Sequence, residues 1–275
     1  MGKTMDEDVL GLAGMNALVV GGGFGMGRET ALLLARVGAN VAVADLDLGR
    51  ADAVRAEVEG LGVKSTALAG DVTKPDEARR VVDEAVAFHG RLEVVCNVVG
   101  LATWADLFSI DDDAWHQQFA INLVHHANIG RAAARHMIDN QIRGRMAFVT
   151  SVSGLYGAPM HGAYGAAKAG LMALVRTMSQ EWGPHGIRVN AVAPDLIATP
   201  RVKAAFDDQG LSTAQVAARE GVPLGRMGSP VDIAGPLVFL VSDLSAFITG
   251  QTIISDGGTH AAFPHARTNA FVPED

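Results

Sequence analysis

A short apolar run that leads into clustered glycines is the feature that most limits the fold of this chain. Residues 16–21 (NALVVG) are rich in β-forming side chains, which predicts a buried strand. A glycine-rich turn at 21–27 (GGGFGMG) follows, and residues 28–39 (RETALLLARVGA) place apolar side chains at helical spacing. Such a turn approaches a pyrophosphate closely, and free N–H groups at the helix start favour its negative charge. The arrangement predicts a nucleotide site, and a flexible loop is the alternative.

Strands and helices alternate along the rest of the chain, which predicts an α/β fold with a doubly wound parallel sheet and helices on both faces. A length of 275 residues fits one large domain, which we place at residues 12–258, with tails at 1–11 and 259–275. Residues 193–200 are expected to be irregular, and the stretch 195–222 suits a lid over a substrate. The further strands are expected at residues 40–44, 63–70, 92–95, 145–150, 187–192 and 252–256, and the further helices at 48–61, from Pro75 onward, and at 113–140, 162–182 and 231–241.

Charge and composition exclude several classes of partner. The 22 Lys and Arg against 30 Asp and Glu give a net charge of −8 without a basic cluster, so we expect no nucleic acid or membrane partner. No run reaches the roughly 18 apolar residues of a membrane span, and the N-terminus lacks a signal-peptide pattern. The single cysteine, Cys96, forms no intrachain disulfide, which suits a reducing compartment. We therefore expect a cytoplasmic protein that acts on a small molecule.

The nine histidines show no metal-binding pattern. His125 and His126 are adjacent, so on a helix they are expected to point to different sides and to be poorly placed to chelate one ion. No metal site is therefore predicted.

Asp45 follows the predicted strand at 40–44, roughly 20 residues past the glycines, where a carboxylate accepts hydrogen bonds from a ribose 2′-hydroxyl. It would repel a 2′-phosphate. Leu46 and Asp47 follow in place of an arginine, and Phe24 in the glycine turn has no basic residue before it. These features favour NAD over NADP. The alternative role for Asp45 is that of a helix N-cap.

Other candidate site residues follow predicted strands. Because ligands of parallel sheets bind beyond the carboxyl ends of the strands, Asp71, Val72 and residues 97–100 are expected on the cofactor side. Ser151 follows the strand at 145–150 and belongs to the same edge. Ordinary loop chemistry is the alternative for each.

Tyr164 and Lys168 are one helical turn apart in the predicted helix 162–182, so their side chains share a face. An ordinary tyrosine, with a pKa of about 10, is a poor base at neutral pH, but a nearby ammonium favours the phenolate. Tyr164 would then take a proton from an alcohol, while Ser151 holds the substrate oxygen. The spacing alone is common, and a solvated pair on a helix surface is the alternative.

These motifs together resemble the short-chain dehydrogenase/reductase family over residues 12–259. The resemblance implies a Rossmann fold with about seven parallel strands, a nicotinamide cofactor, and hydride transfer at a secondary alcohol or ketone. It implies a homo-oligomer, a tetramer, built on the long helices around Asn122 and Lys168. It also implies a catalytic tetrad of Asn122, Ser151, Tyr164 and Lys168, in which Asn122 holds a water and Lys168 also binds the nicotinamide ribose. The matching pieces are the glycine turn 21–27, Gly70 to Thr73, Asn97 with Gly100, the tetrad, Asn190 with Pro194, Thr199, and Asp256 to Gly258.

Some positions depart from the family pattern. Val20 stands in place of a threonine, Phe24 in place of a small or polar residue, and Val98 and Val99 in place of asparagine and alanine. Asp195 stands in place of a glycine, where it would orient the carboxamide, touch the substrate or face solvent. The residues expected to bind NAD are Gly21, Gly23, Phe24, Gly25, Met26, Gly27, Asp45, Leu46, Asp71, Val72, Asn97, Val98, Val99, Gly100, Tyr164, Lys168, Pro194, Ile197 and Thr199.

The residues expected around the substrate are mostly apolar, and His161 is the polar exception near the tyrosine. They favour a bulky apolar alcohol or ketone that is cyclic, terpenoid or steroid-like, although packing in the core is the alternative for these side chains. A 3-oxoacyl thioester reductase that uses NADPH is the nearest alternative function, and a non-catalytic NAD-sensing regulator is another. The apolar candidates are Trp104, Leu155, Met160, Leu196, Ile197 and Phe206.

Overall fold

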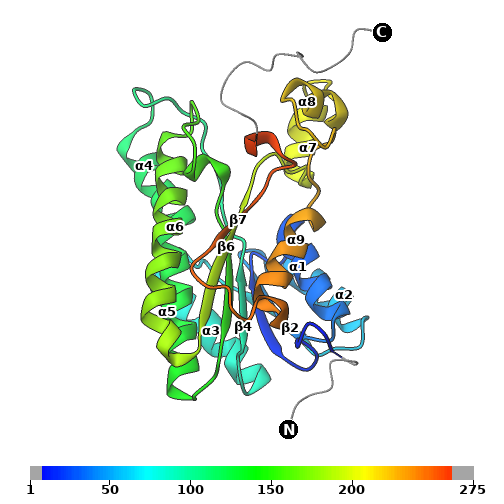
Figure 1. Ribbon diagram of the computed structural model, residues 1–275, viewed down its shortest axis with the longest axis vertical. Coiled ribbons are helices and arrows are strands. Elements are labelled where there is room, and N and C mark those ends of the chain that lie inside the picture. Colours follow the sequence, from blue (N-terminus) through cyan, green and yellow to red (C-terminus); the bar gives the residue numbers. More distant parts are fainter. Residues whose placement is uncertain (1–7, 262–275) are drawn as a thin grey trace.

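The molecule is organised around a sheet of seven parallel strands (Figure 1). The computed structural model describes residues 8–261, so residues 1–7 and 262–275 of the two predicted tails lie outside the described part. The strands are β1 (Asn16–Val20), β2 (Asn40–Asp45), β3 (Ser65–Ala69), β4 (Val94–Asn97), β5 (Arg145–Val149), β6 (Arg188–Pro194) and β7 (Thr252–Ser255). Their order in space is β3-β2-β1-β4-β5-β6-β7. The order changes direction between β1 and β4, where sheets of this kind bind their ligands.

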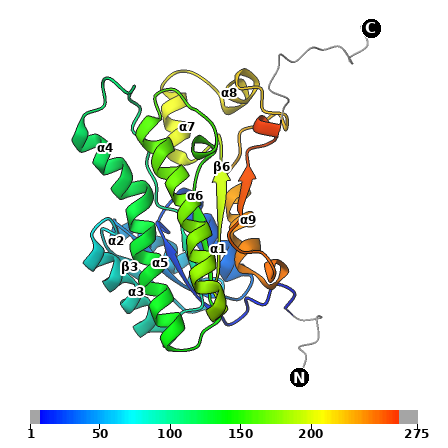
Figure 2. The ribbon, with the colours of Figure 1, turned by 60° about the vertical axis from the view of Figure 1, so that its left-hand side comes forward.

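Helices cover both faces of the sheet, and Figure 2 shows the layer of α5 and α6 from the front. The helices are α1 (Gly25–Arg36), α2 (Leu48–Glu59), α3 (Pro75–His89), α4 (Asp112–Phe119), α5 (His125–Asp139), α6 (Gly162–Trp182), α7 (Pro200–Asp207), α8 (Thr213–Arg219) and α9 (Val231–Val241). The helices α1, α2 and α9 pack on one face, and α3, α5 and α6 pack on the other. The predicted seven-stranded α/β fold is confirmed.

The strands are apolar because both of their faces are buried. In β1, Ala17 and Val19 belong to the core under α1 and α9, whereas Leu18 and Val20 belong to the core under α3 and α5. Successive side chains of a strand point to opposite faces, so a strand covered on both sides needs a continuous apolar run. The short apolar runs in the sequence follow from this requirement.

Several elements end one or two residues from the expected bounds, and three differences are informative. The strand expected at 92–95 is β4, which is shifted to Val94–Asn97 because Ala17 pairs with Val94 and Val20 with Asn97. Residues 193 and 194, expected to be irregular, belong to β6, because β7 supplies a partner strand up to Pro194. The helix expected at 113–140 is interrupted by a π-helical segment, Ala120–Val124, between α4 and α5.

The predicted lid region 195–222 contains the two short helices α7 and α8, which lie beyond the sheet at the upper end of Figure 1. Val216, Ala217, Val222 and Met227 form a small apolar cluster of their own there. None of the helices within residues 8–261 has the length and apolar character required to cross a membrane.

Candidate active site

The glycine-rich turn joins β1 to α1 at the carboxyl edge of the sheet. Gly21 and Gly25 have φ angles of +78° and +53°, in the left-handed region that favours glycine. A Cβ added to Gly27 would lie 1.9 Å from the carbonyl oxygen of Gly21. A Cβ added to Gly23 would lie 2.8 Å from the Asp45 carboxylate. The turn therefore needs glycine at these positions, and its place at the start of α1 fits the pyrophosphate of a dinucleotide.

Phe24 is the N-cap of α1, and its side chain cannot accept a hydrogen bond. The first N–H groups of the helix therefore have no side-chain cap at this position. The guanidinium carbon of Arg50 lies 5.5 Å from the centre of the Phe24 ring. The sequence analysis considered a basic residue only next to Phe24 and directly after Asp45. It therefore did not identify Arg50 as a cation near the cofactor site. The helical spacing of Asp47 and Arg50, whose Nε lies 3.6 Å from the Asp47 carboxylate, was the available signal.

Asp45 ends β2 with its carboxylate fixed against the glycine turn. Its Oδ2 accepts a hydrogen bond from Gly23 N at 3.0 Å, and its Oδ1 accepts one from Asp47 N at 3.1 Å. Asp47, rather than Asp45, caps α2 by accepting a bond from Arg50 N. The N-cap alternative for Asp45 is therefore excluded, and Asp45 presents a negative charge beside the turn. Leu46, the next predicted contact, is exposed.

The ends of β3 and β4 bring the next predicted cofactor residues to this edge. Asp71 accepts hydrogen bonds from the amide and hydroxyl of Thr73, and the hydroxyl bond in particular lowers the pKa of the Asp71 carboxyl. Val72 and Val98 are buried in the two cores, whereas Val99 approaches the glycine turn. Val72 and Val98 therefore offer a ligand mainly their backbone.

The chain that follows β6 returns to the glycine turn. A Cβ on Gly25 would lie 3.8 Å from the Cγ2 methyl of Thr199, which also caps α7. Pro194 is buried at the end of β6. Ile197 is buried in the core that contains residues of α1, and Met26 packs against this core. The structure thus places Thr199 beside the predicted pyrophosphate site.

Asn122 lies in the π-helical segment and is fully buried. Its Nδ2 donates to the carbonyl oxygens of Leu101 and Gln118, and its Oδ1 accepts from Leu101 N at 3.0 Å. A Cβ on Gly100 would lie 3.0 Å from Lys168 Nζ and 3.1 Å from Asn122 Oδ1. The asparagine therefore anchors the loop after β4, and both polar groups meet at Gly100. π-helical segments often occur at functional sites.

Ser151, Tyr164 and Lys168 lie together where β5 ends and α6 begins. Ser151 and Tyr164 are joined by a side-chain hydrogen bond. Lys168 Nζ lies 5.8 Å from the centre of the Tyr164 ring and donates to the Val149 carbonyl oxygen at 2.8 Å. Lys168 is almost completely buried, with 1% of its surface exposed. The one-turn spacing thus places the ammonium on the same side of α6 as the phenol.

Burial acts against both charged forms of this pair. It lowers the pKa of Lys168 to about 7 and raises the pKa of Tyr164, while the bond with Ser151 partly offsets the effect on the tyrosine. The sequence hypothesis expected Lys168, together with the positive charge of an oxidised nicotinamide, to favour the phenolate. In the protein without a cofactor, desolvation has the largest effect on the pKa of Tyr164, and it favours the neutral phenol. The phenolate therefore needs a further positive charge in the site.

The expectation that His125 and His126 point to different sides of a helix is wrong. Both are fully buried, and their ring centres lie 4.0 Å apart. Adjacent helical residues are about 100° apart, so a deeply buried helix can direct both side chains into the interior. Within residues 8–261, no group of three or more His, Cys, Asp or Glu is arranged to hold a metal ion.

The predicted substrate residues separate into two groups. Trp104, Leu155 and Met160 are exposed, and the Trp104 ring lies 4.0 Å from the ring of His161, which is 5.2 Å from that of Tyr164. The other three are wholly or partly in the interior, since Leu196 and Phe206 pack on the lid cluster and Ile197 belongs to the main core. The packing alternative therefore holds for this second group.

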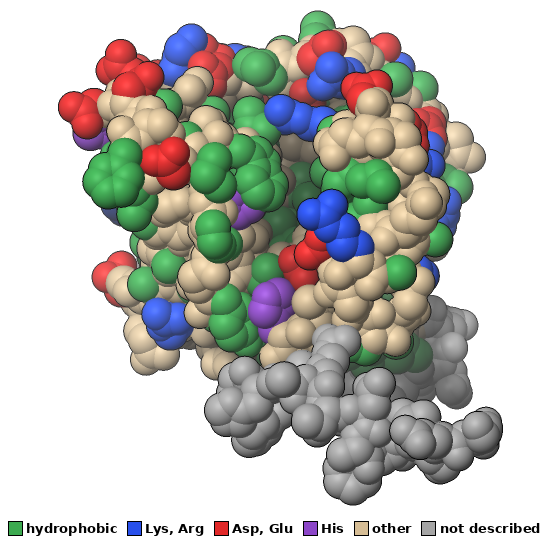
Figure 3. All heavy atoms as spheres, turned by 90° about the horizontal axis from the view of Figure 1, so that it is seen from above, with side chains coloured by type: hydrophobic (Ala, Val, Ile, Leu, Met, Phe, Trp, Pro, Cys, Tyr) green, Lys and Arg blue, Asp and Glu red, His purple; other side chains and the backbone are tan. Residues whose placement is uncertain are grey.

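The structure brings His260 and Tyr156, which the sequence did not single out, close to the site. His260 Nδ1 lies 3.1 Å from Asp256 Oδ2 and 3.8 Å from Asp195 Oδ2, and the Tyr156 ring stacks on the His260 ring. Seen from above, the molecule is hollowed, and hydrophobic, histidine, acidic and basic side chains border the hollow (Figure 3). No sequence spacing links Tyr156 to His260, so their contact was not predictable from local patterns.

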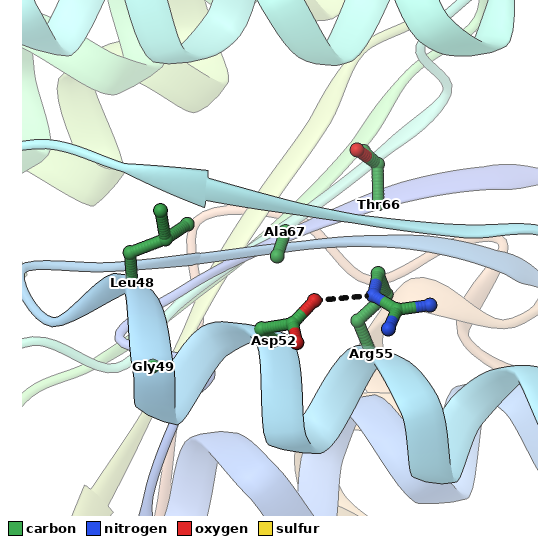
Figure 4. A pocket seen from close by; sticks show the side chains of 6 residues that line it. All are labelled: Leu48, Gly49, Asp52, Arg55, Thr66 and Ala67. Carbon is green, nitrogen blue, oxygen red and sulfur yellow. Dashed lines mark hydrogen bonds and ion pairs between the residues drawn. The ribbon is translucent and has the colours of Figure 1, made fainter.

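A second hollow lies between α2 and the edge strand β3 (Figure 4). Asp52 and Arg55 face each other there, with Arg55 Nε 2.7 Å from Asp52 Oδ1. It includes none of the tetrad residues, so we assign it no part in the chemistry.

Comparison with known proteins agrees with this geometry. Residues 22–260 match a family model described as enoyl-(acyl carrier protein) reductase. The 3-oxoacyl-[acyl-carrier-protein] reductase FabG of Thermotoga maritima is 35% identical over 247 residues, which cover 90% of this chain and 98% of that protein. The chain belongs to the short-chain dehydrogenase/reductase family. It is therefore an oxidoreductase of a family that binds a nicotinamide cofactor.

Other members of the short-chain dehydrogenase/reductase family are equally similar. L-rhamnose 1-dehydrogenase (NAD(P)(+)) of a Sphingomonas species is 36% identical over 251 residues, which cover 90% of this chain and 97% of that protein. The crystal structure of a short-chain type dehydrogenase/reductase from Mycobacterium marinum matches with a TM-score of 0.86 and 30% identity, and covers 93% of this chain and 99% of that one. The solved structure shares the fold, and the names of the two curated relatives give different substrates.

Proposed function

We propose that this protein interconverts a secondary alcohol and a ketone, with NAD(H) as cofactor. The observation that carries the proposal is the group of Ser151, Tyr164 and Lys168 at the same sheet edge as the glycine turn. In oxidation the carbinol C–H bond breaks with its electron pair and the O–H bond releases a proton. When bound, NAD⁺ accepts the hydride and contributes a positive charge.

The protein's own residues handle the proton and the substrate oxygen. Tyr164 takes the alcohol proton in oxidation and returns it in reduction. Ser151 holds the substrate oxygen as its charge changes. Lys168 supplies the adjacent ammonium, and its position depends on its bond to the Val149 carbonyl oxygen. Asn122 is a positioning residue that fixes the loop at Gly100.

The preference for NAD rests on Asp45. Its carboxylate is held by two backbone N–H groups at the position where a ribose 2′-hydroxyl would donate a hydrogen bond, and a 2′-phosphate would be repelled. Arg50 lies over Phe24 and is the nearby cation that would favour NADP. Its proximity to the Asp47 carboxylate supports the assignment of NAD.

A bulky alcohol with an apolar body suits the exposed side chains Trp104, Leu155 and Met160. The similarity to the Thermotoga maritima reductase favours reduction of a 3-oxoacyl thioester with NADPH as the second candidate. The two candidates are compared by kcat/KM. A higher value with an acyl thioester and NADPH than with a cyclic alcohol and NAD would favour the second candidate. An NAD-sensing regulator would bind NAD and turn over neither.

We place the reaction in the cytoplasm and the substrate among small molecules, without a nucleic acid or membrane partner. The one cysteine, Cys96, forms no intrachain disulfide, which supports a reducing compartment. Burial raises the pKa of its thiol to about 12, so Cys96 has a structural role.

Replacement of Tyr164 by Phe tests the chemistry. We expect Tyr164→Phe to lose at least about 1,000-fold in kcat, because the proton acceptor is gone, while the affinity for NADH changes by less than about threefold. Turnover is measured by the absorbance of the reduced cofactor, and NADH binding by fluorescence titration. Thr177→Val removes a hydroxyl from the same helix and serves as the control. A Tyr164→Phe variant with a rate close to that of the wild type would refute the assignment.

A further inference from the structure

Asp195 lies directly after β6, between the ends of β5 and β7. Its backbone N–H points to the Ser255 carbonyl oxygen at 3.4 Å, and the Thr150 N–H donates to the Val192 carbonyl oxygen at 2.8 Å. Ser151 follows Thr150, so Ser151 and Asp195 emerge from neighbouring strands. Neighbouring strands are about 4.8 Å apart. Both residues therefore lie at the carboxyl edge of the sheet, where one ligand can contact residues that follow neighbouring strands.

His260 lies close to Asp195 and stacks on a second aromatic side chain, Tyr156. The ring of His260 lies 4.5 Å from that of Tyr156, with an angle of 11° between the two planes. Tyr156 belongs to the loop after Ser151, and His260 belongs to the turn after β7. The stacked pair therefore joins the loops that follow β5 and β7, on either side of the β6 end that carries Asp195.

The two carboxylates near His260 differ in their partners. Asp256 accepts bonds from the backbone N–H groups of Gly258 and His260, and it lies 3.1 Å from His260 Nδ1, so it fixes the histidine. His260 Nδ1 lies 3.8 Å from Asp195 Oδ2, beyond hydrogen-bond distance, and the Thr259 hydroxyl donates to the Asp256 carbonyl oxygen. Burial raises the pKa of the Asp195 carboxyl. Since a carboxylate can accept about four hydrogen bonds, Asp195 retains acceptor capacity in a half-buried position.

We propose that Asp195 accepts a hydrogen bond from a second hydroxyl group of the substrate, at the end opposite the carbon that is oxidised. The inference rests on the proposed function and names the substrate class as diols or polyols instead of simple alcohols. Trp104 and Leu155 would then contact the apolar body between the two oxygens. The sequence analysis left two alternatives to this role of Asp195. In one it orients the cofactor carboxamide, and in the other it faces solvent.

Cyclohexanol and cyclohexane-1,4-diol are the probes, because they differ only in a hydroxyl across a small ring. In the wild type we expect kcat/KM to be at least about tenfold higher for the diol, after division by two for its two equivalent carbinol carbons. Asp195→Asn, which keeps the shape of the side chain, and Asp195→Gly should reduce this ratio to within about threefold of one. Both variants should keep the wild-type kcat/KM for cyclohexanol and the wild-type KM for NAD.

Asp139→Asn, which makes the same chemical change on the exposed end of α5, should keep the full diol preference. Thermal unfolding of each variant shows whether it is folded. Oxidation of cyclohexanol without a diol preference in the wild type would overturn the inference and leave the proposed function intact. A raised KM for NAD in the Asp195 variants, with equal losses on both alcohols, would assign the residue to the cofactor instead. Oxidation of neither alcohol by the wild type would count against the proposed function itself.

Discussion

At the scale of single residues, the proposed preference for NAD depends on the carboxylate of Asp45, which two backbone N–H groups hold in place. We expect Asp45→Asn to raise kcat/KM with NADP by roughly 10- to 100-fold, since the repulsion of a 2′-phosphate is removed. The same change should lower kcat/KM with NAD by about tenfold, because a hydrogen bond to a charged acceptor contributes about 1.5–3 kcal/mol. Steady-state kinetics with the two cofactors measure both effects.

Asp52→Asn is the matched control, because Asp52 carries a carboxylate on α2 that pairs with Arg55 and not with Arg50. It should shift the NADP to NAD ratio by less than about threefold. If both variants shift the ratio equally, the general loss of negative charge, and not the position of Asp45, decides the cofactor.

At the scale of elements, α5 begins with two buried histidines that a soluble helix would normally expose. Burial lowers the pKa of His125 to about 3 and that of His126 well below its usual range. The unfolded chain titrates near pH 6.5, so below that pH it binds more protons than the folded protein. Stability is therefore fully present above about pH 6.5 and falls as the pH decreases toward 3. The slope is about 1.4 kcal/mol per pH unit for each such histidine.

Replacement of His126 by Leu tests this pH dependence. From pH 7 to pH 5, the loss in the free energy of unfolding should be about 2 kcal/mol smaller in His126→Leu than in the wild type. Urea denaturation at the two pH values gives the difference. His185→Leu changes an exposed histidine and should retain the wild-type loss. An unaltered loss in His126→Leu would mean that the buried imidazole is not the group responsible.

At the scale of the whole molecule, the edge of the sheet formed by β7 leaves apolar side chains uncovered. Ile254 is 42% exposed and Phe247, just before β7, is fully exposed. Edge strands carry unpaired backbone groups and invite association. We propose that a second copy of this chain covers the edge as part of the homo-oligomer, a tetramer, that the family resemblance implies.

A charge at this edge should disrupt the assembly. We expect the double variant Ile254→Asp with Phe247→Asp to have a lower mass by sedimentation equilibrium than the wild type, because burial of a carboxylate in an apolar contact is costly. Phe88→Asp changes an exposed phenylalanine on α3 and should leave the mass unchanged. A monomeric wild type, or a double variant with the wild-type mass, would contradict the proposal.

The sequence by itself determined the alternation of strands and helices, the glycine turn, and the positions of Ser151, Tyr164, Lys168 and Asp45 at the ends of elements. These features depend on periodicity and turn chemistry among near neighbours, which the chain carries locally.

Only the tertiary structure decided which distant side chains meet. It placed Arg50 over Phe24, brought His260 to Asp195 and Tyr156, and buried His125 beside His126. It also decided the balance of charge at Tyr164, since the desolvation of the phenol depends on packing from several elements and outweighs the effect expected from a lysine one turn away. Contacts and burial of this kind arise from the register of the strands and the packing of the loops beyond them, which no short stretch of sequence contains.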